Sequence, residues 1–381
     1  MKYEDICDFE TLYKAYKSAR LSKRGKAQEA RYEQNVVENT LALVELLKSG
    51  KYMPGKFQTF YVYEPKKRLV QSPAFVDKVV QHALVDNGFY EEITRSFVYD
   101  NAASQKNKGT FFALEGLKTD LLDYYRKNKT AEGWVLKCDI RHFFASINHD
   151  ILKQKLAHKI EDTEILRLLF KYIDACEEGL PLGYQTSQLF ALLYLDKFDH
   201  YIKDVLRVKY YGRYMDDFYI ILSDKEQLKV IRNKIAEYLG HLDLELNEKT
   251  KIFPIKNGID YLGFHTYLTE SGKVIRKLRK TSVDRMRARI KYWEKAYPAG
   301  EISKEKILQR FDAFDAHAAH GDTFSLRKKF AERVGDILFQ EVYIRKAIKT
   351  PGKKAPRIKI GKSEKERIDD WYVKNIILQE V

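Results

Sequence analysis

Two adjacent carboxylates between strand-forming stretches constrain this sequence more than any other feature. Residues 208–213 and 219–222 are rich in β-branched and aromatic side chains, which is typical of paired β-strands. Asp216 and Asp217 are then expected at or near the tip of a β-hairpin, where their negative charges repel each other. A divalent cation removes this repulsion, and hard oxygen ligands suit Mg²⁺. A solvated Asp-Asp turn is the structural alternative.

A third carboxylate, Asp139, follows another apolar stretch that we expect to be a buried strand, residues 133–140. Better candidates for capping the next helix, Asn148 and Asp150, lie several residues later, so Asp139 has no evident structural role. Together with Asp216 and Asp217 it can hold two metal ions. That arrangement stabilises both the attacking and the leaving oxygen in phosphoryl transfer.

The chain carries a strand that ends at Asp139 and, later, a Tyr-Met-Asp-Asp hairpin. With its motifs in this order, the sequence resembles a reverse transcriptase of the bacterial retroelement type. The matching motifs run from about residue 57 to about residue 326. The resemblance implies an α+β fold, a right-hand polymerase with fingers, a palm built on an antiparallel sheet and a helical thumb. The implied divisions are an N-terminal helical extension at 1–56, fingers at 57–130, a palm at 131–270 with helices at 151–206, a thumb at 271–345 and a basic tail of unassigned role at 346–381.

The resemblance also implies the chemistry at the acids. Asp139, Asp216 and Asp217 would hold two Mg²⁺ ions, for which Mn²⁺ can substitute, and the carbonyl of Ile140 is a further candidate ligand. In the segment 244–252, Lys249 matches the lysine that protonates the departing pyrophosphate, with Lys251 as the alternate.

Other residues match the nucleotide site of the family. Lys67 and Arg68, in the turn of a predicted hairpin, are candidates to hold the triphosphate, since a guanidinium grips phosphate bidentately. A solvated basic turn is the alternative. Phe144 is the candidate gate that selects deoxynucleotides, because an aromatic side chain here would collide with the 2′-hydroxyl of an incoming ribonucleotide. A plain core phenylalanine is the alternative, although Phe143 is the better candidate for a core position.

The segment 180–188 carries the signal for a subfamily. Gly183 would let the backbone approach the nucleotide closely. Leu182 and Gln188 replace the Gln and Pro that group II intron and retron enzymes carry, and this pairing resembles the error-prone reverse transcriptases of diversity-generating retroelements. A neutral packing substitution is the alternative explanation.

Downstream motifs match regions that hold nucleic acid. Leu262 and Gly263 lie in a segment similar to the primer grip, a tight hairpin that positions the primer end. The basic helical stretch that follows carries Arg285, Arg287 and Arg289, which would track the phosphates of the duplex. A solvated charged face is the alternative.

Composition agrees with a polyanionic partner. Lys and Arg number 69 against 54 Asp and Glu, a net charge of +15. The cysteines Cys7, Cys138 and Cys176 show no metal or disulfide spacing, which is typical of a cytosolic protein. We find neither a signal peptide nor an apolar run long enough to span a bilayer, so we expect a cytoplasmic protein with no membrane partner.

The sequence thus predicts an RNA-directed DNA polymerase that extends a DNA or RNA primer along an RNA template with dNTPs. Its role would be that of a diversity-generating retroelement enzyme, with an accessory protein or a structured non-coding RNA as a further partner. A reverse transcriptase of an anti-phage defence system is the main alternative. A group II intron or retron enzyme and a catalytically dead RNA-binding protein fit the motifs less well.

Overall fold

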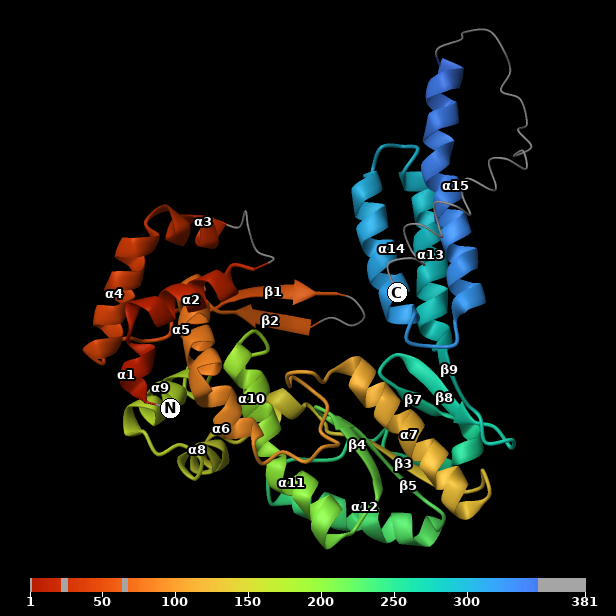
Figure 1. Cartoon of the computed structure of the whole chain (residues 1–381), viewed down its shortest axis with the longest axis horizontal. Coiled ribbons are helices and arrows are strands. Elements are labelled where there is room, and N and C mark those ends of the chain that lie inside the picture. Colours follow the sequence, from red (N-terminus) through yellow and green to blue (C-terminus); the bar gives the residue numbers. More distant parts are fainter. Residues whose placement is uncertain (1, 22–26, 64–67, 349–381) are drawn as a thin grey trace. The chain divides into compact units, whose positions relative to one another are not determined.

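The computed structural model describes residues 2–21, 27–63 and 68–348, with the side chains at 68 and 339–348 left out (Figure 1). The chain divides into two compact units, which are Met1–Ile255 and Lys256–Val381. The boundary lies within the segment 131–270 that the sequence analysis assigned to the palm.

The first unit begins with helices that pack on their apolar faces. In α2 (Phe9–Ala19), the Asp8 side chain caps the first turn, and Leu12, Ala15, Tyr16 and Ala19 are buried at helical spacing. This face packs against α5 (Phe75–Leu84). The neighbouring helices are α1 (Tyr3–Ile6), α3 (Ala27–Gln34) and α4 (Val36–Lys48).

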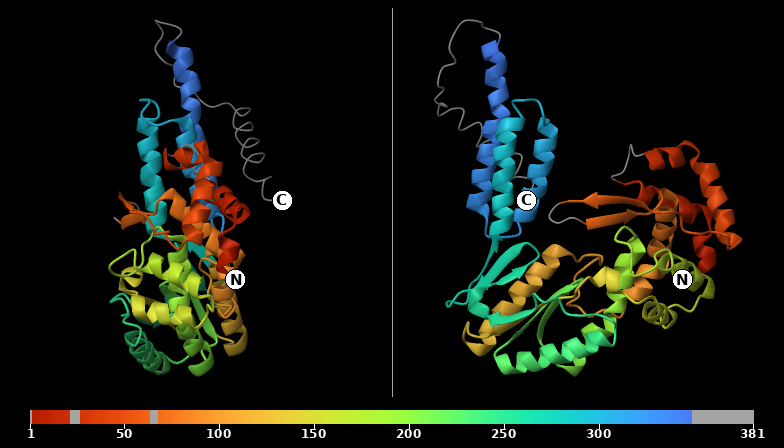
Figure 2. Two further views of the ribbon diagram at one scale, coloured as in Figure 1. Left: turned by 90° about the vertical axis from the view of Figure 1, so that its left-hand side faces the viewer. Right: turned by 180° about the vertical axis from the view of Figure 1, so that it is seen from behind.

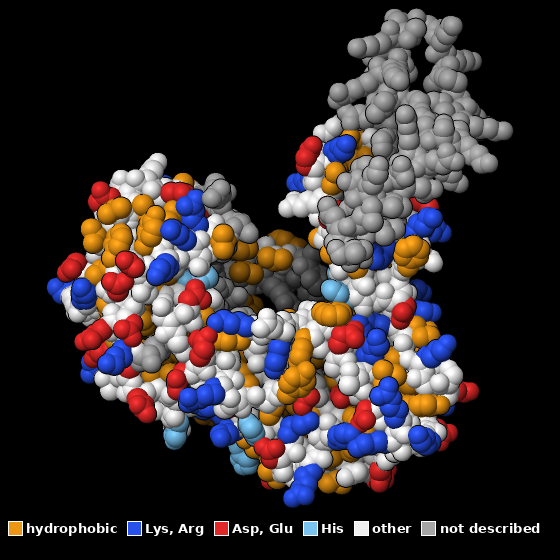
Figure 3. Space-filling view, in the orientation of Figure 1, with side chains coloured by type: hydrophobic (Ala, Val, Ile, Leu, Met, Phe, Trp, Pro, Cys, Tyr) orange, Lys and Arg blue, Asp and Glu red, His pale blue; other side chains and the backbone are white. Residues whose placement is uncertain are grey.

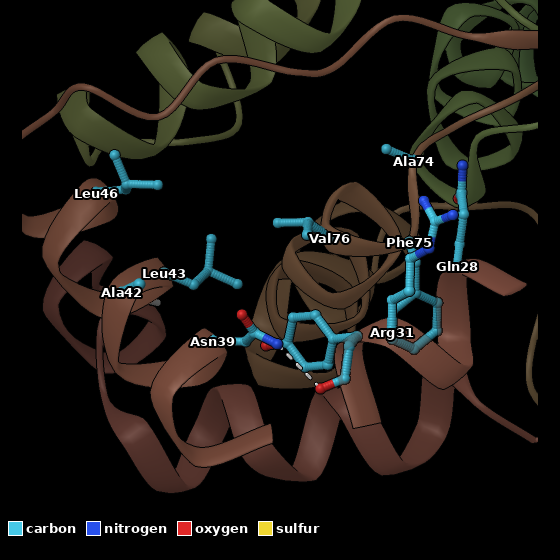
Figure 4. Close-up of a pocket in the computed structure, with 10 residues that line it drawn as sticks. Gln28, Arg31, Asn39, Ala42, Leu43, Leu46, Ala74, Phe75 and Val76 are labelled. Atoms are coloured by element: carbon cyan, nitrogen blue, oxygen red, sulfur yellow. Dashed lines mark hydrogen bonds between the residues drawn. The ribbon is translucent and has the colours of Figure 1, made fainter. Parts of the chain in front are cut away.

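The N-terminal helices leave an apolar surface uncovered. Val37, Leu41 and Leu46 of α4 are exposed, and hydrophobic side chains gather over these helices at the upper left of Figure 3. Beside them is a pocket of about 410 Å³ between α3, α4 and the start of α5, where Asn39 donates to the carbonyl of Tyr32 (Figure 4). No predicted site residue lines this pocket.

A two-stranded antiparallel hairpin follows α4 in the chain. It pairs β1 (Gln58–Val62) with β2 (Arg68–Ser72), and every residue of β1 is exposed. Lys67 lies outside the described residues, and only the backbone of Arg68 is described. The predicted roles of Lys67 and Arg68 at the triphosphate therefore stay predictions.

A four-stranded antiparallel sheet forms the centre of the first unit, in the order β4-β5-β3-β6. Leu136 and Cys138 point to its buried face, where Leu228, Ile231 and Ile235 of α12 (Lys225–Gly240) pack. The strands are β3 (Trp134–Asp139), β4 (Tyr210–Tyr214), β5 (Asp217–Leu222) and β6 (Lys251–Pro254).

Further helices complete the first unit. α7 (Thr110–Asn128) packs beside β4, and Asn148 caps α8, as the sequence analysis allowed, by accepting from the amides of Asp150 and Ile151. The others are η1 (Val85–Phe89), α6 (Tyr90–Thr94), η2 (Phe143–Ser146), α8 (His149–Ala157), α9 (Thr163–Ile173), α10 (Gln185–Tyr194), α11 (Asp196–His200) and η3 (Tyr201–Val205).

The second unit joins a three-stranded sheet to a helical bundle. The sheet has the order β7-β8-β9, formed by β7 (Ile259–Tyr261), β8 (Phe264–Leu268) and β9 (Val274–Leu278). In the bundle, α13 (Lys280–Ala296), α14 (Lys304–Ala318) and α15 (Phe324–Ile348) run side by side (Figure 2). The short η4 (Ile255–Asn257) lies at the boundary between the units.

The segment after α14 docks on this sheet. The amide of Asp322 donates to the carbonyl of Arg276 at 2.7 Å, and the amide of Arg276 donates back to the Asp322 carboxylate at 2.8 Å. The ring of His317 packs against Phe264, and the carbonyl of His320 accepts from Nη1 of Arg276 at 2.7 Å, so both histidines belong to this packed corner.

The mixture of helices with separate antiparallel sheets confirms the predicted α+β class. No helix in the described ranges is both long and apolar enough to traverse a lipid bilayer. The cytoplasmic location stays a prediction.

Candidate active site

The Asp-Asp pair lies where the sequence analysis expected it. Tyr214 pairs with Asp217 across the β4–β5 hairpin, so Met215 and Asp216 form a two-residue turn. Met215 has a φ of +57°, a left-handed conformation that non-glycine residues rarely adopt. Its side chain is buried against Ala103 and Leu192, and this packing holds the strained residue in place.

A buried arginine braces the same turn. Arg213 is fully buried and forms a bidentate ion pair with Asp199, which is also fully buried. Its Nη1 donates to the carbonyl of Met215 at 2.9 Å, and Tyr211 donates to Asp199 at 2.6 Å. The guanidinium therefore fixes the backbone directly before the two acids. Sequence reasoning missed this role, although a charged residue in an apolar strand was a usable signal.

Strand pairing brings the third acid to the same corner of the sheet. Asp139 is the direct cross-strand partner of Asp217, and the amide of Ile140 donates to the carbonyl of Asp216 at 3.1 Å. Side chains of directly paired residues point to the same face. The register therefore places Asp139 and Asp217 side by side, next to the turn that carries Asp216.

A lysine that the sequence analysis overlooked is part of this corner. Lys137 precedes Asp139 by two residues, so strand alternation places both on one face of β3. Its ammonium forms an ion pair with the Oδ1 of Asp217. Both side chains are largely shielded from solvent, with exposures of 14% for Lys137 and 30% for Asp217.

The donors suit a hard divalent cation, yet the side chains do not form a ligand cluster as they stand. Among the described residues, no group of three or more His, Cys, Asp or Glu is placed to hold a metal ion. The oxygen donors and the strand register fit the predicted site for divalent ions at Asp139, Asp216 and Asp217. At Asp217, the ammonium of Lys137 supplies the positive charge.

A further acid lies on the same face of the sheet. Tyr219, the cross-strand partner of Lys137, donates to Asp120 of α7 at 2.9 Å. Burial raises the pKa of Asp120 to about 7. The raised pKa favours the protonated, uncharged form of this carboxyl compared with an exposed aspartate.

The predicted proton donor belongs to a turn tied to Asp139. The amide of Asn247 donates to the carbonyl of Asp139 at 2.7 Å, and the Asn247 side chain accepts from the amide of Lys249 at 3.0 Å. The side chain of Lys249 is exposed. The alternate, Lys251, is also exposed and lies opposite Lys137 on β6.

The two phenylalanines after Asp139 differ in burial as expected. Phe143 is buried in the main core at 2% exposure, which confirms its predicted core position. Phe144 is half-buried and packs against the cluster that contains Met215. The predicted gate residue is thus close to the Asp-Asp turn.

The structure gives Gly183 a packing role. A Cβ there would collide with the backbone of Gln71 in β2, so close approach of two chain segments requires glycine. Leu182 is 40% exposed, and Gln188 accepts a hydrogen bond of 3.4 Å from Ser104. Contact between Gly183, Leu182 or Gln188 and a nucleotide stays a prediction.

The predicted primer grip is a tight turn within the second unit. Tyr261 pairs with Phe264, and the intervening Leu262 and Gly263 both have positive φ, +47° and +90°. A Cβ on Gly263 would come within 2.9 Å of the His317 imidazole. A side chain at 263 would therefore disturb the contact between this turn and α14.

The three predicted phosphate-binding arginines do not share one face of α13. Met286 and Ile290 form the buried stripe, and a helix turns roughly 100° per residue. Arg285 and Arg289, four residues apart, lie on one flank of that stripe, and Arg287 lies on the other. Arg287 also pairs with Asp284 at 2.9 Å.

Comparison with known proteins identifies a family and several relatives to which the sequence is similar. The reverse transcriptase (RNA-dependent DNA polymerase) family matches residues 62–266, more than half of the 381 residues. Protein YkfC of Escherichia coli (strain K12) is 26% identical over 275 residues, which cover 60% of this chain and 70% of YkfC. Group II intron-encoded protein LtrA of Lactococcus lactis subsp. cremoris is 25% identical over 178 residues, 43% of this chain and 28% of LtrA.

Among solved structures, apo telomerase from Candida tropicalis, truncated from the C-terminal domain, aligns with a TM-score of 0.47 at 15% identity. The alignment covers 63% of this chain and 60% of the telomerase chain. This chain therefore spans less than two thirds of that telomerase, as it does of LtrA.

The chain belongs to the reverse transcriptase family, with the right-hand polymerase fold of that family. Its enzyme class is RNA-directed DNA polymerase.

Proposed function

We propose that this protein extends a primer 3′-hydroxyl along an RNA template by nucleotidyl transfer at Asp139, Asp216 and Asp217. The observation that carries the proposal is the strand register that pairs Asp139 with Asp217 beside the turn at Asp216. Two Mg²⁺ ions, or Mn²⁺ ions in their place, would when bound neutralise the triphosphate and lower the pKa of the primer 3′-hydroxyl. RNA-templated primer extension by the purified chain, with Asp216→Asn as the control, tests the proposal.

The surrounding residues take supporting roles. Lys249, on the turn bonded to Asp139, would donate a proton to the departing pyrophosphate. The side chain of Lys249 is exposed and is not fixed in the core. Phe144 would select against ribonucleotides, and the Leu262–Gly263 turn would hold the primer end.

For the biological role, we favour the error-prone enzyme of a diversity-generating retroelement. Leu182 is exposed and aliphatic, so it cannot hydrogen-bond the sugar or base of a bound nucleotide. Loss of such a bond lowers discrimination between correct and incorrect substrates. An anti-phage defence enzyme remains the second candidate, and the genes that flank the coding sequence would separate the two roles.

Sugar choice and base choice are expected to respond to different substitutions. Phe144→Ala should raise ribonucleotide incorporation about tenfold, because it opens space beneath the sugar, and tenfold corresponds to about 1.4 kcal/mol. Leu182→Gln should lower misincorporation by a similar factor without changing sugar choice, because it adds a hydrogen-bonding group. Single-nucleotide insertion kinetics with matched, mismatched and ribonucleotide substrates measure both effects. Unchanged mismatch rates in Leu182→Gln would contradict the error-prone assignment and favour the defence role.

Affinity for a primer–template duplex is expected to fall steeply with salt. The double variant Arg285→Gln/Arg289→Gln removes both charges from one flank of α13, so the log–log salt slope should decrease by about one to two units. Arg287→Gln is the matched control, since Arg287 lies on the opposite flank and pairs with Asp284. Fluorescence anisotropy titrations at several salt concentrations provide the slopes. Equal slopes for the wild type and the double variant would identify that flank as a solvated surface.

A further inference from the structure

Lys137 is placed as a fixed positive charge at the candidate metal site. It lies on β3, two residues before Asp139 and on the same face, and its ammonium pairs with Asp217. With only 14% of its side chain exposed, Lys137 is held close to the sheet. Its partner carboxylate is also the acid that stands directly opposite Asp139.

This contact has two electrostatic consequences. It relieves the repulsion between Asp217 and Asp139, because the ammonium places a positive charge beside two neighbouring negative charges. The Lys137–Asp217 contact also opposes the binding of a divalent cation. A cation that binds Asp217 must displace the ammonium, and the two positive charges then lie close together. Like charges a few ångströms apart repel strongly where water is largely excluded.

We infer that Lys137 is a built-in counter-ion that competes with the divalent cation for Asp217 and so sets the metal affinity of the site. This inference rests on the proposed function, because it takes Asp139, Asp216 and Asp217 as the metal ligands. Lys137 is a positioning residue here, since it acts through Asp217.

The test measures metal binding directly. Mn²⁺ is titrated into the nucleotide-free, full-length protein, and free Mn²⁺ is followed by electron paramagnetic resonance. Lys137→Met keeps the length and apolar stem of the side chain but removes the charge, so the Mn²⁺ dissociation constant should fall about tenfold, or about 1.4 kcal/mol. The Mg²⁺ concentration that gives half-maximal primer extension should fall by a similar factor.

Two control variants isolate the contact. Lys229→Met removes a lysine that pairs with Glu226 on the exposed face of α12, and should change the dissociation constant less than twofold. Lys137→Arg keeps the charge and should stay within about twofold of the wild type, which excludes a general effect of altering this position.

Each other outcome contradicts the inference. Unchanged Mn²⁺ affinity in Lys137→Met with a lower melting temperature would make the contact a structural ion pair. Weaker Mn²⁺ binding would mean that Lys137 holds Asp217 in its ligand position. If the wild type bound Mn²⁺ no better than Asp139→Asn and Asp216→Asn, the metal-site assignment itself would fail, independently of Lys137.

Discussion

Asp216→Asn and Asp139→Asn are each expected to reduce nucleotide incorporation by at least about a thousandfold, a loss of about 4 kcal/mol of transition-state stabilisation. Each substitution removes one of the negative oxygens that would hold a divalent ion while keeping the side chain almost isosteric. Each also lowers the repulsion among the three acids, so the folded protein should not lose stability. Pre-steady-state incorporation of one dNTP on an RNA template measures the effect.

Asp217→Asn provides an informative comparison. It also removes the carboxylate that pairs with Lys137, so we expect a lower melting temperature together with the loss of activity. Binding of the primer–template should remain within a few-fold of the wild type in all three variants. Incorporation by Asp139→Asn or Asp216→Asn at close to the wild-type rate would contradict the assignment of these acids.

The largest loss of stability is expected for Arg213→Met. Removal of the guanidinium leaves Asp199 as a charge at 0% exposure, and breaking a buried pair in this way costs about 3–5 kcal/mol. The carbonyl of Met215 also loses the hydrogen bond from Nη1. Urea denaturation of the full chain, followed by circular dichroism, should therefore show a markedly lower midpoint.

Two companion variants test the physical reason. The double variant Arg213→Met/Asp199→Leu replaces the whole pair with apolar side chains and should recover much of the stability. Arg167→Met removes an exposed arginine that pairs with Glu164, and a surface pair of this kind is worth about 0–1 kcal/mol. Equal losses in Arg167→Met and Arg213→Met would show that burial of the ion pair does not determine its contribution.

Much of the central sheet could be predicted because its signals are local. The β-branched and aromatic stretches on either side of Asp216 and the apolar stretch before Asp139 identify β3, β4 and β5 without tertiary information. The cap at Asn148 followed from the same kind of local chemistry. The three acids could be grouped as one predicted site because each lies at the end of a predicted strand or in the turn beside it.

The residues that sequence reasoning missed act through tertiary contacts. Nothing in the sequence separates Lys137 from an exposed strand lysine until the register shows Asp217 beside it. Arg213 needs Asp199, fourteen positions earlier in the chain, to be tolerated in the core. The close approach of Gly183 to the backbone of Gln71 is a further tertiary contact that the sequence did not show, and its predicted contact with a nucleotide stays a prediction.

Extension of a DNA primer on a defined RNA template tests the central claim most directly. We expect the purified chain to add dNTPs complementary to the RNA in the presence of Mg²⁺ or Mn²⁺, to stop when the metal is chelated with EDTA, and to give no product as Asp139→Asn/Asp216→Asn. Failure of the folded wild type to extend any primer while it binds the duplex, or equal extension by the double variant, would contradict the claim.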